Sequence, residues 1–299
     1  MELPPGLTSR PLRMDDARAV FELMAAQELV DLGSVEIEEA DIVADWSRPS
    51  YDVGTSALGV FAGDRMVGYV EVSGGDRGDA AVHPGLRGRG IGTALAQRMQ
   101  QLARDRGATV VGMPVPVGSP GDQLLESLGY RVRWTSWLLE LPHRAEVPPR
   151  PLPAGYLISE ATPEQHRDAW TVVEDAFLEW SERERQSYED FAATVQGRPG
   201  FEPWHLRAAL DPDGRVAGVS HLSVSDEGFC FVLRLAVRRE QRRRGLAQAL
   251  LADSFRAGRE HGSSRFQLST DSRTGALGLY EKVGMEVTST WVNRAIDLC

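Results

Sequence analysis

The chain has 299 residues, a net charge of −10 and 42% aliphatic, aromatic and cysteine residues. This length allows two domains that each bury a core, and the composition is typical of a globular protein. The acidic balance disfavours nucleic acid and anionic membranes as partners, and two cysteines make neither a disulfide framework nor a metal cluster, so we expect no metal. Neither a membrane span nor a signal peptide is recognisable, which predicts a cytoplasmic location.

The first half of the chain alternates short strand patterns with helix patterns. Met14-Asp15-Asp16 supplies N-cap candidates for the first helix, and Gly63-Asp64-Arg65 between two apolar runs predicts a hairpin. Apolar residues at helical spacing predict another helix from Ile91 onward. The remaining expected elements of this half are strands at 7–13, 57–61, 66–72, 79–82, 109–115 and 130–141, and helices at 35–46 and 123–128.

Four prolines between residues 148 and 153 interrupt regular structure at the middle of the chain. They predict a linker at 144–154 that joins domains at 1–143 and 155–299. Each half predicts a mixed, mostly antiparallel sheet flanked by helices, so the fold class is α+β with two tandem domains. The expected elements of the second half are strands at 156–159, 204–210, 215–224, 228–237, 265–269 and 286–296, and helices at 163–180, 187–196, 246–261 and up to 280.

One basic, glycine-containing turn occurs in both halves, after a strand and before a helix. It consists of Arg242-Arg243-Arg244-Gly245-Leu246-Ala247 in the second half and Arg87-Gly88-Arg89-Gly90-Ile91-Gly92 in the first. The copies are 155 residues apart (242 − 87), and glycines further on keep that offset over about 45 residues, which indicates a repeat. Because helix N-termini and arginines attract anions, each turn predicts a diphosphate site.

These turns, with Leu279-Tyr280-Glu281-Lys282-Val283-Gly284-Met285 downstream of the second one, resemble the GNAT superfamily of acetyl-CoA-dependent N-acetyltransferases. Two copies in one chain are similar to the tandem GNAT proteins of actinomycetes, a group that includes mycothiol synthase. The specific motifs lie in residues 82–130 and 235–285. The resemblance implies acetyl-CoA as co-substrate, with its pantetheine arm between a fourth and a fifth strand that splay apart.

The resemblance also assigns cofactor-binding residues. A main-chain N–H at the end of the fourth strand polarises the thioester in this family, and that position corresponds to Val237. The expected cofactor-binding residues are Leu235, Ala236, Val237, Arg242, Arg243, Arg244, Gly245, Leu246 and Ala247 in the second half, and Val82, Arg87, Gly88, Arg89, Gly90, Ile91 and Gly92 in the first.

Tyr280 matches the family tyrosine that protonates the leaving thiolate, and a phenol with a pKa near 10 can do so at neutral pH. The first half has Leu125 at the matching position. This difference predicts a catalytic second domain and a non-catalytic first one. Core packing of both side chains is the alternative explanation.

The general base is less well defined. Many family members place a glutamate where this chain has Phe231, and its absence counts against the specific activity of mycothiol synthase. We favour Glu227 or His221 as the base, while a water relay would need neither. Other acidic candidates near the expected acceptor site are Glu174, Asp175, Glu179 and Asp226.

The expected function is acetyl transfer to a primary amine of a small molecule, such as an amino sugar, an antibiotic or an amino-acid-like metabolite. Acetylation of a peptide or protein amine is one alternative. A non-catalytic acyl-CoA sensor or interaction protein is another. A monomer and a homodimer are both compatible with the sequence.

Overall fold

The structure is a computed structural model that describes residues 3–225 and 228–298. These residues divide into two compact units. The first unit runs up to residue 135 and includes the chain from residue 290 onward, and the second comprises residues 136–289.

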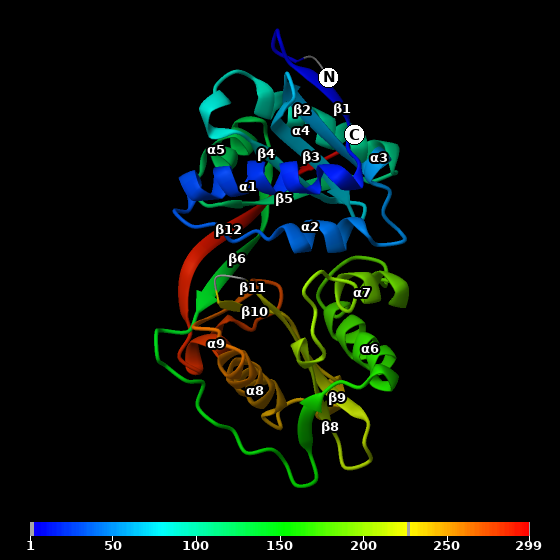
Figure 1. The fold of residues 1–299 in the computed structure, drawn as a ribbon, viewed down its shortest axis with the longest axis vertical. Helices are drawn as coiled ribbons and strands as arrows, with labels where there is room; N and C mark the ends of the chain where they lie inside the picture. The colour runs from blue at the N-terminus through cyan, green and yellow to red at the C-terminus, as the bar shows by residue number, and fades with distance from the viewer. Residues whose placement is uncertain (1–2, 226–227, 299) are drawn as a thin grey trace. The chain divides into compact units, whose positions relative to one another are not determined.

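The first unit is a sheet with helices on both faces (Figure 1). Its elements are β1 (Thr8–Pro11), α1 (Ala17–Asp31), α2 (Glu39–Trp46), α3 (Val53–Ser56), β2 (Ala57–Ala62), β3 (Arg65–Ser73), β4 (Arg77–Val82), α4 (Ile91–Asp105), β5 (Val110–Pro116), α5 (Pro120–Ser127) and most of β12 (Glu286–Asp297). The strand order is β1-β2-β3-β4-β5-β12. Val20 and Trp46 of α1 and α2 pack on one face, whereas Leu95 and Leu125 of α4 and α5 belong to the core of the other.

The second unit repeats this arrangement (Figure 1). Its elements are half of β6 (Arg131–Glu140), β7 (Leu157–Glu160), α6 (His166–Phe177), α7 (Tyr188–Thr194), β8 (Leu206–Leu210), β9 (Val216–Val224), β10 (Phe229–Val237), α8 (Leu246–Glu260), β11 (Arg265–Asp271) and α9 (Leu277–Lys282). The strand order is β6-β11-β10-β9-β8-β7. Val172 and Phe191 of α6 and α7 pack on one face, and Leu251 and Phe255 of α8 belong to the core of the other.

The two halves of the chain exchange their closing strands. β12 pairs antiparallel with β5, with Val292 opposite Val115, inside the first unit. β6 pairs antiparallel with β11, with Leu139 opposite Leu268, inside the second. The predicted strands are therefore present, but the predicted domain boundaries at 143 and 155 differ from the boundaries of the compact units, and residues 144–154 lie in the second unit.

Within the part of the chain that the structure describes, no helix is long and apolar enough to cross a bilayer.

Candidate active site

The fourth and fifth strands of the second unit separate halfway along. β10 and β11 run parallel from the pair Phe229–Arg265 to the pair Val232–Leu268, where their pairing ends. A bulge follows between Val232 and Arg234, and β10 continues to Val237 paired with β9. The bulge bends the strand locally. The result is a fork with one open edge of β10, which is the splay that the family resemblance predicts.

Main-chain N–H groups face this fork. The N–H of Arg238 donates to the carbonyl of Ala217 at 2.9 Å, and since hydrogen-bonding residues alternate along an antiparallel pair, the N–H of Val237 faces the opposite edge. The carbonyl of Val237 accepts from Nε of Arg242 at 3.1 Å. An extended ligand can add along such an edge, and a fixed N–H there can polarise its carbonyl.

The first unit has a corresponding fork. Among the described residues, β4 pairs with β5 in parallel at one position, Arg77 opposite Gly112. The N–H of His83 donates to the carbonyl of Val67 at 3.0 Å. By the same alternation, the N–H of Val82 faces the gap between β4 and β5. Both units therefore have an open strand edge where the fourth and fifth strands separate.

The two basic turns follow the same backbone path. Gly90 and Gly245 cap α4 and α8 in the left-handed region, with φ of 85° and 84°. Two residues earlier, Gly88 has φ of 75° and Arg243 has φ of 64°. A non-glycine residue in this region is strained, and such strain persists only where the surroundings hold it. Leu246 and Ile91 are 1% exposed, so only their main chain can contact a ligand.

The first arginine of each turn binds a carboxylate. Arg242 donates to both carboxylate oxygens of Glu179, at 2.7 and 2.8 Å. Arg87 donates to both oxygens of Asp31 at the same distances. The hydrogen bond from Arg242 lowers the pKa of Glu179. These two arginines therefore brace the turns, whereas Arg244 donates to the hydroxyl of Tyr156 at 3.3 Å.

Sequence reasoning missed this bracing role of Asp31 and Glu179. Asp31 is the last residue of α1, and Glu179 follows the end of α6. A carboxylate at the end of the first long helix of each repeat was the available signal.

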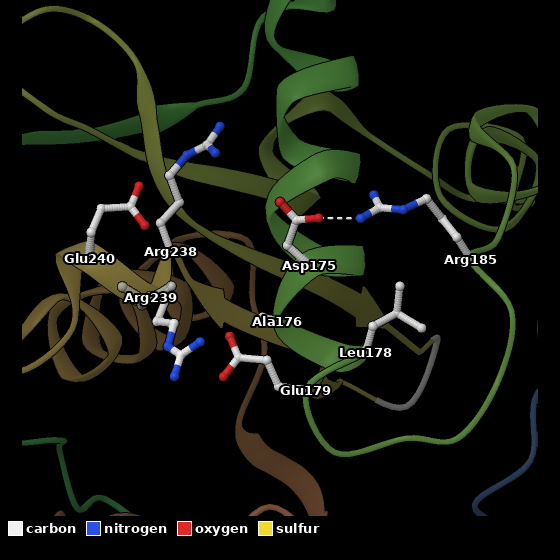
Figure 2. A pocket seen from close by; sticks show the side chains of 9 residues that line it. Asp175, Ala176, Leu178, Glu179, Arg185, Arg238, Arg239 and Glu240 are labelled. Atoms are coloured by element: carbon white, nitrogen blue, oxygen red, sulfur yellow. Dashed lines mark hydrogen bonds and ion pairs between the residues drawn. The ribbon is translucent and has the colours of Figure 1, made fainter.

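A cavity of about 370 Å³ opens beside the end of β10. Figure 2 shows α6 on one side of it and the connection from β10 to α8 on the other, with Asp175 and Arg185 facing each other as an ion pair. Three acidic and three basic side chains are among its lining residues. The cavity is lined by Asp175, Ala176, Leu178, Glu179, Arg185, Val237, Arg238, Arg239 and Glu240.

Tyr280 lies on α9 in the apolar cluster that also contains Leu235 and Leu268, the residues that flank the fork. Burial raises the pKa of Tyr280 to about 12, so the phenol stays protonated at any physiological pH. Leu125 occupies the matching place in the core of the first unit and is 3% exposed. The helix that follows the fifth strand thus carries a buried tyrosine in the second unit and a buried leucine at the matching position in the first.

His221 is fully buried on β9, where its Nδ1 accepts from Arg234 at 2.8 Å. Because arginine can only donate, the ring is neutral with its proton on Nε2. Nε2 is buried without a hydrogen-bond partner among the described residues. Burial, and then the nearby Arg234, lower the pKa of His221 well below its ordinary value. These features disfavour His221 as a general base.

The other base candidates either form ion pairs with arginines or lie outside the residues that the structure describes. Glu174 is 1% exposed and accepts two hydrogen bonds from Arg183, at 2.7 and 2.8 Å. Asp175 is bound by Arg185, and Glu179 by Arg242. Asp226 and Glu227 fall outside the described residues, so Glu227 stays a prediction. Within the described ranges, no three histidine, cysteine or carboxylate side chains gather as metal ligands.

Comparison with known proteins finds the same architecture elsewhere. The model of the acetyltransferase (GNAT) family matches residues 19–121 and 165–285. A mycothiol acetyltransferase of Salinispora arenicola is 31% identical over 252 residues, which covers 80% of this chain and 78% of the relative. A GCN5-related N-acetyltransferase structure from Sphaerobacter thermophilus matches with a TM-score of 0.77 and 26% identity over 99% of this chain and 97% of its own. A tandem GNAT protein from the clavulanic acid biosynthesis pathway shares the fold, with a TM-score of 0.74 and 20% identity over 98% of this chain and 99% of its own.

Proposed function

Since the chain belongs to the acetyltransferase (GNAT) family, we propose that its second unit transfers an acetyl group from acetyl-CoA to a primary amine of a small molecule. One observation carries this assignment. Both units have a fork and a basic turn, but only the second adds a buried tyrosine at the helix that follows the fifth strand. The similarity to mycothiol acetyltransferases supports a small acceptor, such as an amino sugar, an antibiotic or an amino-acid-like metabolite.

The residues of the second unit divide the reaction between them. The N–H of Val237 donates to the thioester carbonyl and stabilises the negative charge that develops when the amine attacks it. The new C–N bond forms, the C–S bond breaks, and Tyr280 gives its proton to the departing thiolate. The turn from Arg243 to Leu246 holds the diphosphate of the co-substrate. The proton lost by the amine passes to water or to Glu227.

The first unit is proposed to bind acyl-CoA without transferring its acyl group. Its fork, its turn and Arg89 match those of the second unit, whereas Leu125 cannot donate a proton. This assignment supports a division of labour between the two repeats.

A charge reversal at matched positions tests the proposal. Arg244 and Arg89 occupy the same place in their turns, and both are exposed, so we expect glutamate at either site to fit without a steric conflict, although Arg244 gives up a hydrogen bond to the Tyr156 hydroxyl at 3.3 Å. We expect Arg244→Glu to weaken acetyl-CoA binding in the second unit at least tenfold and to reduce acetyl transfer to a panel of amines. Arg89→Glu should remove only the binding that belongs to the first unit.

Thiol release in the presence of each amine measures transfer, and calorimetry with acetyl-CoA counts the sites. If Arg89→Glu abolishes acetyl transfer while Arg244→Glu leaves it unchanged, the chemistry belongs to the first unit and the proposal is refuted. Binding without transfer to any amine or peptide would instead support an acyl-CoA sensor. This is the second candidate function, because Glu174, His221 and Glu179 each already have an arginine partner and are not free to act as a base.

A further inference from the structure

The linker between the repeats follows α8 along its length. Nη2 of Arg259, in the last turn of α8, donates to the carbonyl of Ala145 at 2.7 Å. Val147 is 5% exposed and packs in the same core as Leu251 and Phe255. This segment is therefore fixed to the second unit rather than acting as a flexible spacer.

The same segment continues to the first turn of α8. Nε2 of Gln248 donates to the carbonyl of Pro148 at 2.8 Å. A Cβ atom added to Gly245 would lie 2.7 Å from Cγ and 2.8 Å from Nε of Arg150, which means that the Arg150 side chain lies directly on the basic turn. We call residues 145–150 the linker strap.

Prolines hold Arg150 in this place. Pro149 precedes it and Pro151 follows it. A residue before proline is confined to extended conformations, and proline fixes its own φ, so the backbone from which the exposed Arg150 side chain extends has little freedom. The arrangement is built into the sequence of the strap.

The position of Arg150 is electrostatically unfavourable without an anion. The N-terminus of α8 carries the positive end of the helix dipole, and Arg243 and Arg244 add two cations to it. Among the described residues, Arg150 makes no ion pair or hydrogen bond. Arg150 is exposed to solvent, and an anion placed between it, the other two arginines and the helix N-terminus would be stabilised by all of them.

Among the described residues, no arginine lies in the corresponding place over the turn of the first unit. A Cβ atom added to Gly90 or to Gly88 would have no non-neighbouring atom of the described residues within 4 Å, whereas one added to Gly245 would meet Arg150. The two turns share their backbone path but differ in what covers them.

We propose that Arg150 of the linker strap binds the diphosphate of acyl-CoA in the second unit. The inference rests on the proposed function, because it assumes that this turn holds the co-substrate. It predicts that the strap raises the affinity of the second site above that of the first.

Binding of acetyl-CoA to the full-length chain tests the inference, with the second site identified as the one that Arg244→Glu weakens. We expect Arg150→Ala to raise the Kd of that site about tenfold, the usual effect of losing one charge-assisted contact. High salt should reduce this difference. Arg167→Ala is the matched control, because Arg167 is an exposed arginine near the start of α6 that stacks on Tyr188, and we expect it to leave the Kd unchanged.

Acetyl-dephospho-CoA, which lacks the 3′-phosphate and keeps the diphosphate, should show the same tenfold loss in Arg150→Ala. A loss that disappears with this probe would overturn the assignment to the diphosphate. An unchanged or tighter Kd in Arg150→Ala would overturn the inference alone and leave the proposed function intact. Failure of the unmodified chain to bind acetyl-CoA would overturn both.

Discussion

Replacing Tyr280 by phenylalanine should reduce catalysis without reducing stability. The ring is 8% exposed and its apolar contacts remain in the variant. Its hydroxyl makes no hydrogen bond to another residue within the described ranges, so its removal should change the free energy of unfolding by less than about 1 kcal/mol. Loss of a positioned acid should lower kcat by about 10² to 10⁴.

Tyr130→Phe is the matched control in the first unit. Tyr130 is 2% exposed, and its hydroxyl is bonded to Gln100 at 3.2 Å and to the carbonyl of Ala96 at 3.4 Å. Removing that hydroxyl should cost about 1 kcal/mol of stability and leave acetyl transfer unchanged. Thiol release gives kcat, and urea denaturation gives the free energy of unfolding.

The pH profile adds a separate criterion. Burial raises the pKa of Tyr280 to about 12, so the acid remains protonated at pH 9 and its ionisation cannot produce an alkaline decline in kcat there. An unchanged kcat in Tyr280→Phe would remove the phenol from the mechanism. A parallel loss of stability and rate would reduce Tyr280 to a packing residue.

Two further predictions concern stability. Arg294 of β12 and Asp122 of α5 form an ion pair at 2.6 Å, and both are under 10% exposed. Asp122→Asn should destabilise the first unit by about 1 to 3 kcal/mol, because it removes the shorter of the two ion pairs of Arg294 and leaves only the one with Glu126 at 3.1 Å. A urea midpoint that does not move would contradict this. Burial lowers the pKa of His205 to about 4 and that of His221 well below its ordinary value. The unfolded chain then binds more protons, and stability should fall as pH decreases from about 6.5 towards 4, which urea midpoints at pH 7.5 and 5.5 would reveal.

Local chemistry explains why the elements and the turns could be predicted. The hairpin at Gly63, the left-handed caps at Gly90 and Gly245, and the helical spacing after each cap depend on neighbours in sequence. The constant offset between the two copies of the basic turn also predicted that both halves share one fold. The fork at Val232 and Leu268 required the family resemblance, because a bulge and an early end of pairing leave no clear mark in one sequence.

Long-range partners explain what could not be predicted. β6 and β12 have the sequence pattern of closing strands, but the pattern does not say which sheet each one closes. The bond from Arg234 that makes His221 an acceptor joins two strands. The carboxylates that bind Arg87 and Arg242 lie 56 and 63 residues away in the chain. Each of these contacts depends on tertiary structure.

The strand exchange accounts for the linker strap. β6 already lies in the sheet of the second unit, at one edge, and β7 lies at the other edge. Neighbouring strands are about 4.8 Å apart, so the chain must cross roughly 24 Å between these edges. Residues 141–156 can reach about 50 Å when extended, which leaves enough length to follow α8 from Arg259 to Gly245 on the way. Because the exchange makes this crossing necessary, it brings Arg150 to the basic turn of the second unit, while the first unit, which has no such crossing, keeps an uncovered turn.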